Sequence, residues 1–78
     1  MEDELIGTVK LFAGNFTPRN YLECDGRLLP IREYQALFAL LADTYGGDRQ
    51  TTFALPKLDR IGQCRYIICV KGIFPSRD

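Results

Sequence analysis

The segment from Gln63 to Lys71 limits the possible folds of this chain more than any other. Its side chains alternate as in a strand, and apolar residues occupy both faces at its centre, with Ile68 on one face and Ile67 and Cys69 on the other. A strand that is apolar on both faces is typical of the interior of a sheet. We therefore expect this segment to return beside the opening strands and to complete a compact shell without a chemically active cleft.

The first 30 residues are expected to supply the neighbouring strands. Residues 5–12 mix β-branched and aromatic residues with alternating directions, which predicts a strand, and turn residues follow at 14–20. Asp25-Gly26 then stands between two apolar-containing runs. This dipeptide tolerates positive φ at both central positions of a turn, so it predicts a two-residue β-hairpin, which Pro30 closes.

One amphipathic helix is predicted over residues 32–43. Four apolar side chains repeat there with helical spacing: Tyr34, Leu37, Phe38 and Leu41. Neither Ile31 nor Arg32 offers the side-chain oxygen that usually caps a helix start. Gly46-Gly47 supplies the chain reversal after the helix.

Residues 48–63 resemble a loop, and Phe53 and Leu55 are expected to pin it onto the helix and sheet. Together the elements predict an α+β fold: a small mixed or antiparallel sheet with a β-hairpin, one amphipathic helix and a returning C-terminal strand. A chain of 78 residues has room for one domain, spanning residues 1–78. Roughly 63% of the unfolded surface can be buried at this size, so the core is thin and a partner subunit would stabilise it.

The balanced charge of the chain argues against a nucleic-acid partner. Ten basic and ten acidic side chains give a net charge of zero, whereas phosphate contacts need a clustered basic excess. The longest apolar run, Ala36 to Ala42, is far shorter than the about 20 residues of a membrane-spanning helix. Residues 1–5 lack the features of a secretory signal, so we expect synthesis in the cytoplasm.

Few residues are candidates for catalysis or metal binding. The chain has no His, and Cys24, Cys64 and Cys69 are odd in number and lack C-x-x-C spacing, which argues against a disulfide framework and a zinc site. We expect these thiols to pack as small apolar side chains. The glycine-rich stretch 46–49 follows a helix, whereas phosphate-binding loops open one. No enzymatic activity, cofactor or metal is therefore expected.

Five sequence segments resemble, in their order and spacing, motifs of the phage tail collar domain family of tail-fibre proteins. They are IGTVKLFAG (6–14), CDGRLLPI (24–31), YQALFALL (34–41), YGGD (45–48) and TTFALP (51–56). The resemblance implies a structural, non-enzymatic tail component, found in a virion or tail-like particle after assembly. Its expected partners are other tail or fibre proteins or further copies of itself, and related fibres are commonly trimers.

The resemblance also suggests which residues hold the shape of the domain. They are Cys24, Asp25, Gly26, Gly46, Gly47, Phe53 and Pro56. Asp25 and Gly26 are expected to make a turn, Phe53 to anchor the loop, and Pro56 to end it.

The chain departs from the family pattern in two informative ways. Asn20-Tyr21 stands where Gly-Trp is usual, and Arg32 stands where Ser is usual, in agreement with the weak helix start. Longer relatives insert a Gly- and His-rich region before a phrase similar to residues 66–77. We expect that region to be an excursion whose two ends lie close together. The distal tip, where receptor or metal binding is expected, would then be missing here.

An alternative reading of the aromatic residues is a free-standing ligand- or glycan-binding module. Tyr21, Tyr45 and Tyr66 would then be the stacking surfaces, and a glycan or receptor would be the partner.

Overall fold

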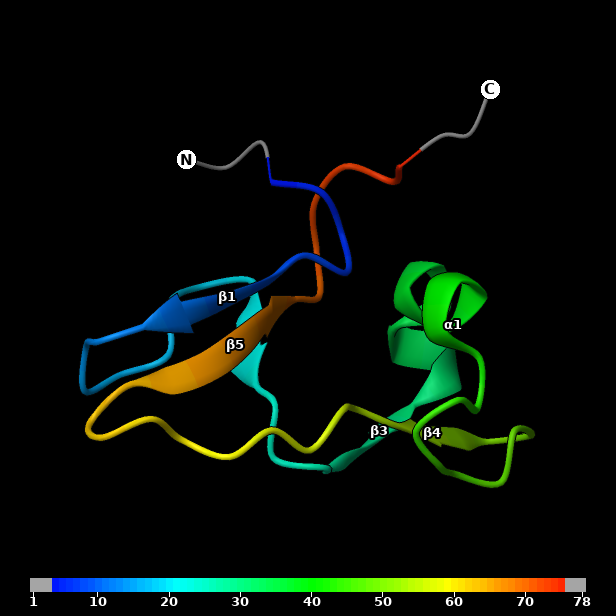
Figure 1. The fold of residues 1–78 in the computed structure, drawn as a ribbon. Coiled ribbons are helices and arrows are strands. Elements are labelled where there is room, and N and C mark those ends of the chain that lie inside the picture. Colours follow the sequence, from blue (N-terminus) through cyan, green and yellow to red (C-terminus); the bar gives the residue numbers. More distant parts are fainter. Residues whose placement is uncertain (1–3, 76–78) are drawn as a thin grey trace.

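Between residues 4 and 75, two small antiparallel sheets and one short α-helix make up the fold, which is α+β with more strand than helix (Figure 1). The computed structural model describes residues 4–75, so the ends of the predicted 1–78 domain lie outside the described residues. The elements are β1 (Val9–Phe12), β2 (Tyr21–Glu23), β3 (Leu28–Pro30), the 3₁₀ helix η1 (Ile31–Glu33), α1 (Gln35–Leu41), β4 (Thr52–Ala54) and β5 (Arg65–Cys69). One sheet has the strand order β1-β5-β2, and the other pairs β3 with β4.

β5 is the central strand of the larger sheet. Val9 of β1 lies opposite Ile68, and Tyr21 of β2 lies opposite Cys69. Ile67 and Ile68 point to opposite faces of the sheet, yet only 1% and 0% of their surfaces are exposed. The prediction that the C-terminal segment returns between the opening strands is therefore confirmed.

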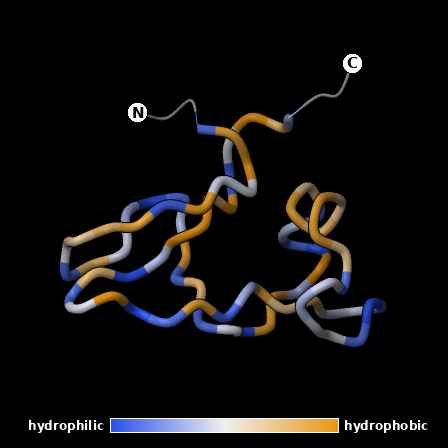
Figure 2. The backbone as a smooth tube through the Cα atoms, viewed as in Figure 1, coloured by the Kyte–Doolittle hydropathy of each residue, from blue (hydrophilic) through white to orange (hydrophobic). Residues whose placement is uncertain are grey.

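The core joins both sheets to α1. Its buried residues are Ile6, Cys24, Leu29, Leu37, Phe53, Leu55, Ile68 and Val70. α1 is apolar along most of its length (Figure 2). The rings of Phe38 and Phe53 meet edge to face with their centroids 5.5 Å apart, which couples α1 to β4.

The predicted β-hairpin at Asp25-Gly26 is wrong. β2 and β3 flank this turn, but β2 pairs with β5 and β3 pairs with β4. Gly26 has a φ of 84°, whereas Asp25 is not among the described residues with positive φ. A tight hairpin of the expected type needs positive φ at both positions, so the chain instead crosses from one sheet to the other here.

The first strand is shorter than the predicted 5–12. Thr8 donates its N–H to the Leu5 carbonyl at 3.1 Å, and Gly7 has a φ of 91°, so residues 5–8 form a turn. Gly7 donates to the Cys69 carbonyl and Cys69 donates to the Thr8 carbonyl, both at 2.9 Å. Two residues therefore oppose one, as in a β-bulge, and β1 begins only at Val9.

The predicted helix over 32–43 is divided and shortened. The 3₁₀ turn Ile31–Glu33 precedes α1, and Ala42, with a φ of 49°, ends it. No side chain caps the start of either helix, at Pro30 or at Tyr34, as the sequence predicted. The α-helix is therefore held mainly by its packing.

The predicted loop over residues 48–63 contains the strand β4. Phe53 of β4 lies opposite Leu29, and Thr52 lies opposite Pro30 at the end of β3. Phe53 and Leu55 are 0% and 1% exposed, so they do pin this segment as predicted.

The two ends of the described chain lie side by side (Figure 1). Leu5 forms a parallel bridge with Ile73. Ile6 donates its N–H to the Ile73 carbonyl at 2.8 Å, and Ile73 donates to the Glu4 carbonyl at 3.0 Å. Within residues 4–75, the helices are too short to cross a membrane.

Candidate functional site

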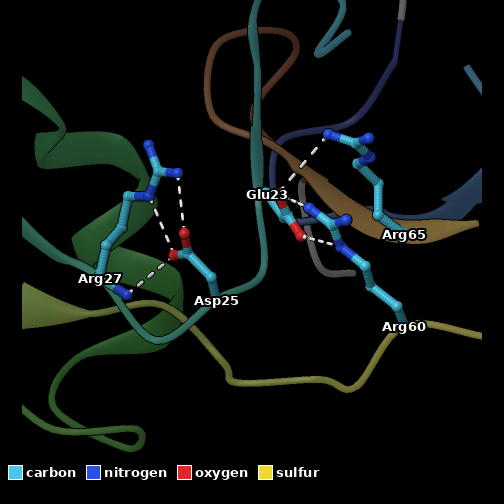
Figure 3. Close-up of polar contacts among 5 residues, drawn as sticks. All are labelled: Glu23, Asp25, Arg27, Arg60 and Arg65. Carbon is cyan, nitrogen blue, oxygen red and sulfur yellow. Dashed lines mark hydrogen bonds and ion pairs between the residues drawn. The ribbon is translucent and has the colours of Figure 1, made fainter. Parts of the chain in front are cut away.

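The segment Cys24–Arg27 carries the chain from the larger sheet to the smaller one. Cys24 is fully buried, its N–H donates to the Tyr66 carbonyl, and its carbonyl accepts the N–H of Leu58, both at 2.9 Å. The Asp25 carboxylate accepts the backbone N–H of Arg27 at 3.1 Å and its guanidinium Nε and Nη2 at 3.0 and 2.9 Å (Figure 3). These hydrogen bonds hold the pKa of Asp25 below its ordinary value.

Gly26 packs against the segment that leaves β4. A methyl group at Gly26 would lie 3.3 Å from Cβ of Lys57. The backbones of Asp25 and Lys57 form an isolated antiparallel β-bridge. Pro56, next to Lys57, is buried. The structure therefore brings Cys24, Asp25, Gly26 and Pro56 together at the junction between the sheets, with Asp25 and Gly26 in a crossing turn rather than a hairpin.

Glu23 braces the same junction from the end of β2. Its carboxylate accepts two hydrogen bonds from Arg60, Nε at 3.0 Å and Nη2 at 3.2 Å, and Nη1 of Arg65 lies 3.7 Å away (Figure 3). The Arg60 guanidinium holds the pKa of Glu23 below its ordinary value. Sequence reasoning missed this cluster because its members come from three separate segments.

Gly46 and Gly47 shape the reversal between α1 and β4. Their φ values are 130° and 100°, as the predicted reversal requires. Gly46 accepts the N–H of Ala54 at 3.0 Å, and a methyl group at Gly47 would collide with the backbone of Thr52 and Phe53. The structure therefore brings Gly46, Gly47 and Phe53 together, away from the junction.

The Asp48 carboxylate organises the next turn. Its Oδ1 accepts the backbone N–H groups of Gln50, Thr51 and Thr52 at 2.8, 2.8 and 2.9 Å, and its Oδ2 accepts the Thr51 hydroxyl at 2.8 Å. These bonds, that from Thr51 N–H first, hold the pKa of Asp48 far below its ordinary value. Both oxygens of the Asp48 carboxylate are therefore engaged in hydrogen bonds that hold the loop of residues 48–52.

The three candidate tyrosines do not form a common surface. The register places Tyr66 on the face of Ile68 and Tyr21 on the opposite face. Tyr66 packs against the core, while Tyr21 donates its hydroxyl to Glu4 at 3.0 Å and lies under the Lys10 ammonium. Tyr45 follows α1, outside the larger sheet.

Two of the three thiols are core residues, as expected. Cys24 and Cys69 are 0% and 1% exposed, whereas Cys64 is half-buried outside the core, so the expectation that all three thiols pack in the core is wrong for Cys64. Burial raises the pKa of Cys24 to about 11 and also raises the pKa of Cys69. Thiols of this kind are protonated at neutral pH and are poor nucleophiles. Within residues 4–75, acidic and thiol side chains form no group of metal-ligating composition.

The carboxylates and thiols described above make contacts within the chain, so exposed apolar side chains are the main candidates for contact with a partner. Val9 and Leu11 on β1 are 39% and 45% exposed. Leu5, Ile73 and Phe74, where the two ends of the described chain meet, are about half exposed. The other large apolar residues exposed among those described are Phe16, Leu28, Leu40, Tyr45, Leu58 and Ile61. For several of these residues, such as Leu28 and Ile61, the sequence does not indicate whether the side chain is exposed or lies in the core.

Comparison with known protein families shows to which family the chain belongs. The family model of the phage tail collar domain matches residues 7–60, which is more than half of the chain. The chain belongs to the phage tail collar domain family. No curated protein and no solved structure matches it significantly.

Membership in this family relates the chain to structural proteins of phage tails. The collar domain is a structural tail-fibre family associated with the virion or tail, and it is not known for enzymatic activity. The matched residues reach from the β-bulge at Gly7 to Arg60 beside Glu23. β5 lies beyond the matched range, although it is the central strand of the larger sheet.

Proposed function

We propose that this collar domain is a non-catalytic component of a tail-like assembly and that it works by packing against neighbouring tail or fibre proteins. The observation that carries the proposal is the family match over residues 7–60. The exposed apolar residues of the first and last segments supply the contact surface: Leu5, Val9, Leu11, Ile73 and Phe74. The resemblance also implies trimers, and the trimer is a prediction that sedimentation of the pure chain can check.

The polar chemistry of the domain supports a structural role. The carboxylates of Glu23, Asp25 and Asp48 are each bonded to groups of the chain that fix a junction or a loop. Such carboxylates stabilise the folded shape and do not converge on a common cleft. What a partner meets is then mainly shape and apolar surface.

The glycan-binding alternative gains no support from the arrangement of the tyrosines, which do not share a face. It stays a prediction, and a glycan array is its test. Binding of any glycan that is lost in Tyr45→Ala would favour it over a purely structural role.

The experiment that tests the proposed function is fractionation of tail-like particles from a culture that produces this chain. An antibody against the chain should detect it in the sedimented particles and should label one fixed position on them in electron micrographs. Recovery of the chain only in the supernatant, with unlabelled particles, would contradict the proposal. Assembly-defective particles, processed in parallel, control for passive sedimentation.

A further inference from the structure

The segment of residues 57–63, between β4 and β5, is exposed along its whole length. Its backbone is nevertheless fixed at both ends. Leu58 donates its N–H to the Cys24 carbonyl at 2.9 Å, and Ile61 exchanges two backbone hydrogen bonds with Cys64 at 3.0 and 2.9 Å. A surface segment that is already ordered loses little conformational freedom when a partner binds.

Arg60 lies in the middle of this segment and is held by Glu23 of β2 (Figure 3). Its Nε and Nη2 donate to the Glu23 carboxylate at 3.0 and 3.2 Å. A guanidinium has five N–H donors, so Nη1 and Nη2 together form a second donor pair that fits another carboxylate. The Arg60 side chain is 53% exposed, and among residues 4–75 no hydrogen bond uses its Nη1. The second donor pair is therefore available to a partner.

Two guanidinium groups face the single carboxylate of Glu23. Nη1 of Arg65 on β5 lies 3.7 Å from Oε1 of Glu23, an ion pair without a hydrogen bond (Figure 3). The Arg65 side chain is only 16% exposed, and its Nε is buried without a hydrogen-bond partner among the described residues. Asp25, the next acidic residue along the chain, is paired with Arg27. Glu23 is thus shared by two cations, and the cluster has one positive charge in excess.

Basic residues stay in excess when the neighbouring charges are included. Lys57, Arg60 and Arg65 carry three positive charges, and Glu23 and Asp59 carry two negative ones, which leaves one. A single carboxylate from outside would therefore neutralise this part of the surface. A nucleic acid would require a larger cluster of Lys and Arg than this.

We propose that the segment 57–63 binds an acidic side chain of a neighbouring tail or fibre protein, and that Arg60 is the residue that receives it. The carboxylate accepts hydrogen bonds from Nη1 and Nη2 of Arg60, whose other side stays bound to Glu23. Leu58 and Ile61, which are 39% and 55% exposed, flank Arg60 in the sequence and help to exclude water from the contact. An arginine among apolar residues is typical of protein interfaces.

The inference rests on the proposed function, because it names one contact of the domain with its neighbours in the assembly. A different protein, rather than a second copy of this chain, is the expected source of the carboxylate. Of the seven acidic side chains among the described residues, four are already bonded within the chain: Glu4, Glu23, Asp25 and Asp48. A second copy therefore has few free carboxylates to offer.

The first experiment compares the incorporation of variants into tail-like particles. Arg60→Glu places a negative charge where the partner's carboxylate binds, so recovery of the chain with the particles should fall by about tenfold or more. Arg60→Lys keeps the charge but loses the paired donors, so recovery should fall by a smaller factor. Arg19→Glu makes the same charge change at an exposed arginine outside the segment, and it should leave recovery unaltered.

The second experiment uses the pure, unaltered chain. NMR follows the guanidinium N–H signals during titration with sodium acetate, and sodium chloride at equal ionic strength is the control. The Arg60 signals should shift about threefold more with acetate than the Arg19 signals do, because Glu23 holds the Arg60 donors in place. Equal responses of the two arginines would overturn the inference.

Failure of the inference is distinguishable from failure of the proposed function. If the unaltered chain sediments with particles and the Arg60→Glu chain does so equally, the Arg60 contact is wrong and the proposed function stands. If the unaltered chain is absent from particles, the proposed function is wrong, and the acetate titration decides on the Arg60 site. Self-association of the pure chain that Arg60→Glu abolishes would assign the carboxylate to a second copy and contradict the inference. If Arg60→Glu does not fold, Arg60→Lys replaces it, and full recovery of that variant would overturn the inference.

Discussion

Gly47 lies directly against the backbone of Phe53, in a conformation with a φ of 100°. Gly47→Ala should therefore destabilise the fold by about 2–4 kcal/mol, because the new methyl group meets backbone atoms and the φ is strained. Gly62→Ala is the matched control, since Gly62 also has positive φ but has open space around it. It should cost about 1–2 kcal/mol. Urea midpoints give both values, and equal midpoints for the two variants would contradict the packing argument.

Phe53 is the largest fully buried side chain among the described residues and should be the most sensitive core position. Phe53→Ala removes about 3–5 kcal/mol, a large part of the roughly 4–12 kcal/mol that a chain of this length has. We expect a much lower urea midpoint for this variant, measured by circular dichroism. Phe74→Ala, at a ring that is 50% exposed, should change the unfolding free energy by less than about 1 kcal/mol. An unfolding free energy that Phe53→Ala lowers no more than Phe74→Ala does would show that the core lies elsewhere.

The larger sheet could be predicted from sequence more securely than the smaller one. Ile67, Ile68 and Cys69 place apolar side chains on both faces of one strand, and only an interior position buries both. The strands that pair with β2 and β3 could not be predicted from the pattern of apolar residues. Asp25-Gly26 has the local chemistry of a hairpin, but the choice of partner strand is made by distant segments.

The shape-holding role of the proposed residues stays a prediction, and only their placement can be compared with the structure. The seven proposed shape-holding residues fall into two groups, one at the junction around Asp25 and one around Gly47 and Phe53. The brace of Glu23 with Arg60 was not predictable, because its residues lie 37 positions apart. The outer position of β1 in the larger sheet could not be predicted either, since sequence alternation does not say which strand of a sheet is outermost.

The stability of the domain should fall in acid partly through Asp48. Its carboxylate accepts three backbone N–H groups and a hydroxyl, so its folded pKa lies below the unfolded value of about 3.9. A lowered folded pKa means that the stabilisation is complete above the unfolded pKa and is lost as pH falls toward the folded one. Asp48→Asn should therefore be less stable than the unaltered chain at pH 7. The difference should shrink steadily at acidic pH, and a difference independent of pH would contradict the role of the charge.

Thiol labelling should separate the three cysteines. Cys24 and Cys69 are buried, and the pKa of Cys24 is raised to about 11, so neither should react with a disulfide reagent in the folded domain near pH 8. Cys64 is half-buried and should react in the native state. All three should react in urea, and Cys64→Ser should remove the native reaction. Rapid native labelling of all three would mean that the sheet opens readily.

The most direct test of the fold is a pair of NMR contacts across β5. Val9 lies opposite Ile68 on one side and Glu23 lies opposite Ile67 on the other, both as non-bonded pairs, whose Cα atoms approach to about 4.5 Å. We expect strong Hα–Hα Overhauser effects for Val9 with Ile68 and for Glu23 with Ile67. Absence of both, or a strong contact between β2 and β3 instead, would contradict the placement of the C-terminal strand at the centre of the sheet.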